Sequence, residues 1–254
     1  MSKIIAIANQ KGGVGKTTTA INFSAALAEL GKACLLVDMD PQSNSTTGLG
    51  IDKNTPHNIY NVLLNGMDIG QIIKTTADDW LDIAPSSNDL AGAEAELVNL
   101  PDRYTKLKSS LEKISNVYEY IIIDCPPSLG FLTLNSLIAA NSVLVTVQGE
   151  YFSLEGLGQL SDTINRLIDQ NGLELEGVLF TMINSQTILA RQVADNVKKH
   201  FGDKVYSTII PRMVKLAEAP SFGKSIFSYD PNGKAKQCYL ELAYEFLERQ
   251  NGRG

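Results

Sequence analysis

The stretch Lys3-Ile-Ile-Ala-Ile-Ala-Asn-Gln-Lys-Gly-Gly-Val-Gly-Lys-Thr17 decides the fold of this 254-residue chain. Its first six residues form a short apolar run that is typical of a buried β-strand. A glycine-rich loop follows, and the next segment predicts a helix from about Thr17 to Leu30, which Gly31 is placed to end in the left-handed conformation. Strand, glycine loop and helix in this order predict a phosphate-binding turn.

The loop departs by one residue from the common phosphate-loop pattern G-x-x-x-x-G-K-[ST]. The segment Gly15-Lys-Thr17 fits the end of this pattern, but the leading glycine would fall on Gln10. Two other glycines in the loop still let the backbone approach a phosphate closely, because neither has a side chain. We expect Lys16 to neutralise the β- and γ-phosphates and the Thr17 hydroxyl to bind Mg²⁺.

The rest of the chain alternates between apolar strands and helical stretches. Continuous apolar runs, rather than alternating ones, indicate strands that are buried on both faces. The sequence therefore predicts an α/β fold with a doubly wound, mostly parallel sheet, helices on both faces and a single domain over residues 1–254. Only two residues precede the first strand, so we expect no N-terminal helix-turn-helix domain. The later strands are expected at Ala33–Asp38, Leu81–Ala84, Tyr120–Asp124, Ser142–Val147, Gly177–Ile183 and Val205–Ile210.

Acidic residues follow two of these strands. Asp38 and Asp40 lie in the segment Leu35–Gln42, where the second strand ends. Asp124 lies in Ile121–Ser128, where another strand ends. A carboxylate at the end of a buried strand is costly unless a charged partner meets it, and a metal bound to triphosphate is such a partner. We expect Asp124 to bind Mg²⁺ directly or through water, with the other two flanking it. Asp38 has an alternative role as the cap of a loop or helix.

Composition indicates a protein of the cell interior with one basic region. The net charge is −6, and the three cysteines form no C-x-x-C pair, which favours a reducing compartment. No run of residues has the length and hydrophobicity of a signal peptide or membrane helix. Residues 187–236 contain nine Lys and Arg against four Asp and Glu, a net of +5 that leaves −11 on the rest. This region is either a basic surface or a solvated, lysine-rich helix face.

Several motifs resemble those of one family. Lys11-Gly-Gly-Val-Gly-Lys-Thr17 resembles the deviant Walker A motif of the ParA/MinD ATPases, a branch of the P-loop NTPases. Asp38-Met-Asp-Pro-Gln42 is similar to their second motif, and Ile122-Ile-Asp-Cys-Pro-Pro-Ser128 to their Walker B motif. Tyr151–Leu157 and Ile210–Ser221 resemble the chromosomal ParA, or Soj, branch. The resemblance runs nearly from end to end.

The resemblance implies a Mg²⁺-dependent ATP hydrolase, slow and partner-stimulated, that forms a sandwich dimer around two ATP molecules. Lys11 would reach the phosphates of the partner subunit, Gly12 would lie at the interface, and Asp40 would act on the attacking water. The implied catalytic set is Lys11, Lys16, Asp38 and Asp40, and the implied metal ligands are Thr17 and Asp124. The implied nucleotide-binding residues are Lys11, Gly12, Gly13, Val14, Gly15, Lys16, Thr17, Thr18, Pro211 and Arg212.

The family's dimer binds double-stranded DNA without sequence preference and releases it when a ParB-type partner stimulates hydrolysis. The resemblance thus implies a cytoplasmic protein that is nucleoid-associated when ATP-bound and acts in chromosome or plasmid partitioning. Relatives usually have Asp where Asn184 stands and Arg where Gln186 stands, so we expect weaker or more salt-sensitive DNA binding. The candidate DNA contacts are Arg191, Lys198, Lys199, Lys215, Lys224, Lys234 and Lys236.

Three alternatives share the phosphate loop. A MinD-like positioning ATPase would dock on lipid through a C-terminal amphipathic helix, but Glu241, Glu245 and Glu248 disfavour an anionic membrane, so we expect the tail to dock on the core. An iron–sulfur reductase would need two cysteines on one face, and Cys34 and Cys125 are not spaced for it. A metabolic kinase is the third alternative, although no acceptor-site signature stands out.

Overall fold

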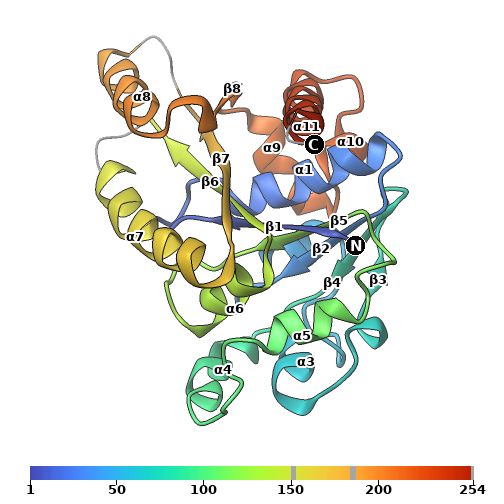
Figure 1. Ribbon diagram of the computed structural model, residues 1–254. Coiled ribbons are helices and arrows are strands. Elements are labelled where there is room, and N and C mark those ends of the chain that lie inside the picture. Colours follow the sequence, from blue (N-terminus) through green and yellow to red (C-terminus); the bar gives the residue numbers. More distant parts are fainter. Residues whose placement is uncertain (150–152, 184–186, 253–254) are drawn as a thin grey trace.

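One sheet forms the centre of the computed structural model, which describes residues 1–149, 153–183 and 187–252. Its eight strands lie in the order β3-β4-β2-β5-β1-β6-β7-β8 (Figure 1). All neighbouring strands are parallel except β3 and β4, so the predicted mostly parallel sheet is confirmed. The strands are β1 (Lys3–Ala8), β2 (Cys34–Asp38), β3 (Lys74–Thr75), β4 (Leu81–Ala84), β5 (Tyr120–Asp124), β6 (Ser142–Gln148), β7 (Glu174–Thr181) and β8 (Val205–Ile210).

Helices cover both faces of this sheet. Helices α1, α9, α10 and α11 lie on one face, and α3 to α8 on the other (Figure 1). The α-helices are α1 (Lys16–Glu29), α2 (Asn44–Gly48), α3 (Ile59–Asn65), α4 (Leu90–Leu97), α5 (Lys106–Glu112), α6 (Phe131–Ala139), α7 (Ser153–Asn171), α8 (Ile188–Phe201), α9 (Val214–Glu218), α10 (Ile226–Tyr229) and α11 (Lys234–Asn251). Short 3₁₀ helices span Ile69–Gln71, Gly202–Lys204 and Ala219–Phe222.

The central strands supply side chains to both layers in alternation. In β5, Ile121 and Ile123 pack into the core under α3–α8, whereas Ile122 packs into the core under α1 and α11. The same alternation runs along β1, where Ile4, Ala6 and Ala8 face one core and Ile5 and Ile7 face the other. Period-two alternation between two apolar cores explains why these strands have no polar face.

The order of the strands brings three carboxyl ends together. After β1 the chain forms α1 and crosses to β2, and β5 later returns between them. Asp124 of β5 is the register partner of both Ile7 in β1 and Asp38 in β2. The loop after β1 therefore lies beside both acidic strand ends, at the point where doubly wound sheets bind ligands.

A few element boundaries differ from those predicted. The antiparallel edge strand β3 has only two residues and no apolar run, so its residues carry no strand signal. Strand β7 begins at Glu174 rather than Gly177 and ends at Thr181, because Met182 takes a φ of 51°, outside the extended conformation of a strand. Gly31, with a φ of 75°, follows α1 in the expected left-handed conformation. Among the described residues, none of the helices combines the length and hydrophobicity needed to cross a membrane.

Candidate nucleotide-binding site

The loop between β1 and α1 has the conformation of an anion-binding turn. Gly13 and Gly15 have φ values of 73° and 82°, which only glycine adopts readily. Apart from its chain neighbours, a Cβ placed on Gly12 or Gly13 would meet no atom within 4 Å among the described residues, so the space beside the loop is open. Alternating right- and left-handed residues point successive N–H groups toward one concavity, and such a nest suits a phosphate.

Lys16 spans this loop from the first turn of α1. Its side chain is buried, and its Nζ atom donates a hydrogen bond of 3.1 Å to the carbonyl oxygen of Lys11. Burial lowers the pKa of the Lys16 ammonium, and the negative charge of Asp124 opposes that effect. The structure therefore holds a dehydrated cation against the loop, close to the end of β5.

Asp124 is fully buried at the end of β5, where its two carboxylate oxygens have different surroundings. Oδ2 accepts a hydrogen bond of 2.7 Å from the Ser45 hydroxyl, and Thr17 also donates to the carboxylate. Oδ1 has no hydrogen-bond partner among the described residues. Burial raises the pKa of Asp124, because the charged form has lost its hydration. An unpartnered buried carboxylate oxygen beside the Thr17 hydroxyl fits a divalent cation, since hard cations prefer such oxygen ligands.

Asp38 and Asp40 hold the loop after β2. Asp38 is fully buried and accepts hydrogen bonds from the Thr46 N–H at 2.8 Å, the Thr46 hydroxyl at 2.7 Å and the Asp40 N–H at 3.1 Å. These bonds match the loop-capping alternative for Asp38. Burial raises the pKa of Asp38, and the neighbouring Asp124 carboxylate raises it further. Asp40 is also buried, at 7% exposure, and its carboxylate accepts a hydrogen bond of 2.9 Å from the Gln42 N–H.

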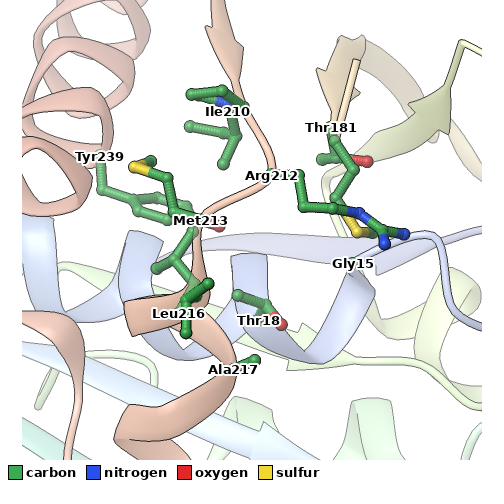
Figure 2. A pocket seen from close by; sticks show the side chains of 12 residues that line it. Gly15, Thr18, Thr181, Ile210, Arg212, Met213, Leu216, Ala217 and Tyr239 are labelled. Carbon is green, nitrogen blue, oxygen red and sulfur yellow. The ribbon is translucent and has the colours of Figure 1, made fainter. Parts of the chain in front are cut away.

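A cavity of about 410 Å³ adjoins the phosphate loop. Its lining side chains come from α1, the end of β7, the loop after β8, α9 and α11 (Figure 2). The predicted nucleotide-binding residues Thr18, Pro211 and Arg212 all line it, together with Gly15. A mostly apolar cavity beside an anion-binding loop is suited to the base and sugar of a nucleotide. The remaining lining residues are Thr181, Met182, Ile210, Met213, Val214, Leu216, Ala217 and Tyr239.

Sequence reasoning missed the residues that support the site. Ser45 and Thr46 lie in the short helix α2 and bind the two buried carboxylates. Gln148 and Thr181 contact the phosphate loop from the ends of β6 and β7, and Asn9, directly after β1, joins the start of the loop to β6. Four of the five have ordinary polar side chains in no recognised motif, whereas Thr181 begins the segment 181–187, which has a counterpart in the family. For Gln148, the signal available was a polar residue at the carboxyl end of an otherwise apolar strand.

The basic residues predicted to bind DNA do not form one patch within the subunit. Arg191, Lys198 and Lys199 are exposed on α8, on one face of the sheet. The other four lie around α9–α11, on the opposite face. Lys236 is paired with Glu29 at 2.7 Å, with its side chain 17% exposed, which makes it a poor DNA contact. Asn184 and Gln186, and part of the Tyr151–Leu157 motif, lie outside the described residues.

The C-terminal helix and the cysteines bear on the alternatives. Tyr239, Leu242 and Phe246 of α11 are buried against α1, so the tail docks on the core as expected. Glu245 accepts hydrogen bonds from the backbone of β8 instead of facing solvent alone. The cysteines at positions 34, 125 and 238 are all buried, and burial raises the pKa of each thiol. None is presented at the surface, as a cluster shared between subunits would require.

Comparison with known proteins places this geometry in a family. A model described as an AAA domain matches residues 2–177. The chain is 53% identical over 249 residues to the sporulation initiation inhibitor protein Soj of Bacillus subtilis, covering 96% of this chain and 98% of that protein. It is 49% identical over 253 residues to the chromosome partitioning protein ParA of Myxococcus xanthus, covering 98% of this chain and 89% of that protein.

A solved structure agrees with these matches. Cobyrinic acid a,c-diamide synthase from Mycobacterium smegmatis, with bound ADP and magnesium, superposes with a TM-score of 0.87 and 36% identity, covering 100% of this chain and 97% of that one. The α/β architecture of this nucleotide-binding protein is thus the architecture described above. With a phosphate loop, buried carboxylates and near-full-length relatives in agreement, the chain belongs to the ParA/Soj family of chromosome-partitioning ATPases.

Proposed function

We propose that this chain is an ATP-driven switch in chromosome or plasmid partitioning. It binds ATP with Mg²⁺, dimerises around the nucleotide and holds double-stranded DNA without sequence preference. Slow ATP hydrolysis, stimulated by a ParB-type partner, ends the DNA-bound state of the dimer. The names of the chromosome-partitioning relatives support this proposal, as does the presence of ADP and magnesium in the M. smegmatis structure.

The observation that carries the proposal is the pair formed by the open phosphate loop and the incomplete Asp124 carboxylate. A buried charge that no protein group completes is costly, and a ligand that completes it offsets the cost. Thr17 and Asp124 would hold Mg²⁺, which when bound spreads the negative charge of the phosphate oxygens. Lys16 would lie against the phosphates, exchanging its bond to the Lys11 carbonyl for a charged partner.

Hydrolysis needs a water molecule in line with the terminal phosphate. Asp40 is the candidate that orients it, because its carboxylate accepts a bond from the Gln42 N–H, whereas that of Asp38 accepts three bonds from Thr46 and Asp40. Asp38 is more suited to holding the β2 loop and α2 in place. Lys11 would act across the dimer interface, where a cation from the partner offsets charge on the phosphates.

DNA binding would come mainly from α8. Arg191, Lys198 and Lys199 are exposed on this helix, and cations on one helix face suit the phosphate backbone. Dimerisation would place two copies of this surface in one particle, which explains why ATP should control DNA affinity. The Lys236–Glu29 ion pair would stabilise the fold and would not bind DNA.

The test is DNA retention as a function of salt, with a non-hydrolysable ATP analogue and Mg²⁺. We expect retention to require the analogue and to disappear with ADP. Replacing Lys198 and Lys199 by alanine should reduce the slope of log K against log salt by about 0.9 for each DNA phosphate that is no longer neutralised.

Alanine at Lys108 and Lys113 of the α5 region provides a control with the same change in charge. This pair should leave the slope unchanged, since α5 lies far from α8 in Figure 1. Equal slopes for the two double variants would contradict the α8 assignment. Nucleotide-independent retention would contradict the switch itself.

A further inference from the structure

We infer that Gln148 and Thr181 are positioning residues that set the phosphate loop in its phosphate-binding conformation before any nucleotide arrives. The inference rests on the proposed function, because it concerns how the same site achieves its affinity for nucleotide. Neither residue belongs to the phosphate-loop motif, and both come from strands that lie far along the chain.

The two side chains bind consecutive carbonyl groups of the loop. The Nε2 atom of Gln148 donates to the carbonyl oxygen of Gly13 at 2.7 Å, and the Thr181 hydroxyl donates to that of Val14 at 2.7 Å. Both side chains are nearly excluded from solvent, at 7% and 2% exposure. Buried hydrogen bonds of this length fix the orientation of the groups that they join.

These bonds determine where the loop N–H groups point. A trans peptide unit is planar, and its C=O and N–H point in opposite directions. The Gly13 carbonyl shares its peptide plane with the Val14 N–H, and the Val14 carbonyl shares its plane with the Gly15 N–H. With both carbonyls turned down onto the sheet, both N–H groups turn up, away from the strands and into the open concavity.

The strands supply the two donors as a pair. Gln148 and Thr181 are register partners at the carboxyl ends of β6 and β7. A Cβ on Gly15 would lie 3.5 Å from the Thr181 side chain, so Thr181 also packs directly under the loop. Asn9 adds a third support at the start of the loop, since its side chain joins the Lys11 N–H to the Thr146 carbonyl oxygen.

Preorganisation of this kind raises nucleotide affinity through the loop. Thr181 also lines the cavity beside the loop, whereas Gln148 is not among its lining residues, so Gln148→Met separates the effect on the loop from a direct contact. A glycine-rich loop that lacked these donors would sample several orientations of its peptide planes, and binding would have to select one. The buried carbonyl oxygens would also lose their partners, which disfavours the conformation that binds phosphate. Loss of either donor should therefore weaken binding to the phosphates.

The experiment measures the dissociation constant of ADP with Mg²⁺ by calorimetry. ADP is used because it lacks the γ-phosphate, so that loop binding is separated from hydrolysis and dimerisation. Thr181→Val keeps the shape and removes the donor, and it should weaken ADP binding about tenfold. Thr181→Ser restores the hydroxyl and should return to within about twofold of the unaltered chain. Gln148→Met removes the other donor at similar length and should act in the same direction.

Thr146→Val is the matched control. Thr146 is buried on β6, its hydroxyl has no hydrogen-bond partner among the described residues, and its backbone carbonyl is unchanged in valine. Thr146→Val should bind ADP like the unaltered chain. Without nucleotide, the melting temperature of Thr181→Val should be close to that of Thr146→Val. ADP binding by Thr181→Val and Gln148→Met as tight as that of Thr146→Val would overturn the inference. If the unaltered chain itself failed to bind ADP, the proposed function would fail instead.

Discussion

Two buried carboxylates at opposite ends of the same sheet differ in how they are partnered. Glu176, at the amino end, is fully buried and receives the Lys3 ammonium at 3.0 Å, the Ser142 hydroxyl at 2.9 Å and the Gln250 amide at 2.9 Å. Asp124, at the carboxyl end, is equally buried, lies beside a second carboxylate in the register and keeps one oxygen without a partner among the described residues.

The difference separates a structural site from a binding site. At the amino end the protein supplies every partner itself, and the Glu176 cluster ties β1, β6 and β7 to the end of α11. At the carboxyl end the protein leaves the charge incomplete, which costs stability in the absence of ligand. Substitutions at the carboxyl end should therefore change nucleotide affinity, and those at the amino end should change stability. One substitution at the carboxyl end should also raise stability rather than lower it.

The largest expected effect is on nucleotide affinity, from Lys16→Ala at the carboxyl end. We expect ATP binding to weaken by about 100-fold or more, because a dehydrated cation facing the phosphates is lost. The free energy of unfolding without nucleotide should change little, since the ammonium is held there at the expense of its hydration. Calorimetry and urea denaturation measure the two quantities. Tight ATP binding by this variant would show that the loop is not the phosphate site.

The next effect is at the amino end, where Glu176→Gln should lower the stability of the protein by about 2 kcal/mol. The substitution keeps the shape but leaves Lys3 without its negative partner, and the partial exposure of Lys3 limits the loss. Nucleotide affinity should not change. Urea denaturation at neutral pH gives the first quantity, and an ADP titration of the same sample gives the second. If Glu176→Gln instead lost nucleotide affinity and kept its stability, Glu176 would belong to a binding site and not to a structural one.

A smaller effect of opposite sign is expected for Asp124→Asn. Removing this charge relieves its burial and its repulsion by Asp38, so the nucleotide-free protein should gain about 1 kcal/mol. The dependence of nucleotide binding on Mg²⁺ should be lost at the same time. Denaturation in the presence of a chelator provides the measurement. If Asp124→Asn instead destabilised the protein, the Asp124 carboxylate would be a structural group like that of Glu176.

The smallest effect concerns Glu245 on α11, a third carboxylate with protein partners. Partial burial alone would raise the pKa of Glu245, but hydrogen bonds from the Ser207 and Thr208 N–H groups, the Thr208 hydroxyl and Arg249 outweigh it and lower the pKa. A lowered pKa means that this stabilisation is present above the ordinary value of 4.5 and is lost as pH falls through the folded pKa.

Relative to Glu245→Gln, the unaltered chain should thus be more stable at pH 7, by less than about 1 kcal/mol after solvent screening, and the difference should shrink as pH falls below 4.5 and through the lowered folded pKa. Paired denaturation curves at several pH values test this prediction. A difference that grew on acidification would contradict the lowered pKa. The same bonds occupy N–H groups of the edge strand β8, which limits its pairing with other chains.

Local sequence predicted much of the fold and the centre of the site. The apolar runs of β1, β2 and β5 were recognisable because each is buried on both faces, and the acids that end β2 and β5 were recognisable because an acid is rare there. The loop glycines followed from their backbone freedom. These features are local, so one stretch of sequence carries each of them.

The supports of the site were not predictable in the same way. Gln148 and Thr181 bind loop residues more than 130 positions away, and nothing in their own surroundings in sequence indicates that contact. Counting charges along residues 187–236 likewise gave no information on which face each lysine would occupy, so the pairing of Lys236 with Glu29 was missed. Such contacts are fixed by the packing of distant elements.

Light scattering with and without a non-hydrolysable ATP analogue and Mg²⁺ tests most directly whether nucleotide joins two copies of the chain. The mass should rise from 27.6 kDa to about twice that value when the analogue is present. Gly12→Val should bind nucleotide yet stay at the single-copy mass, because a Cβ at Gly12 meets no atom within 4 Å in the described part of the chain and would instead face the partner subunit. A mass of one copy for the unaltered chain under both conditions would contradict the proposed switch.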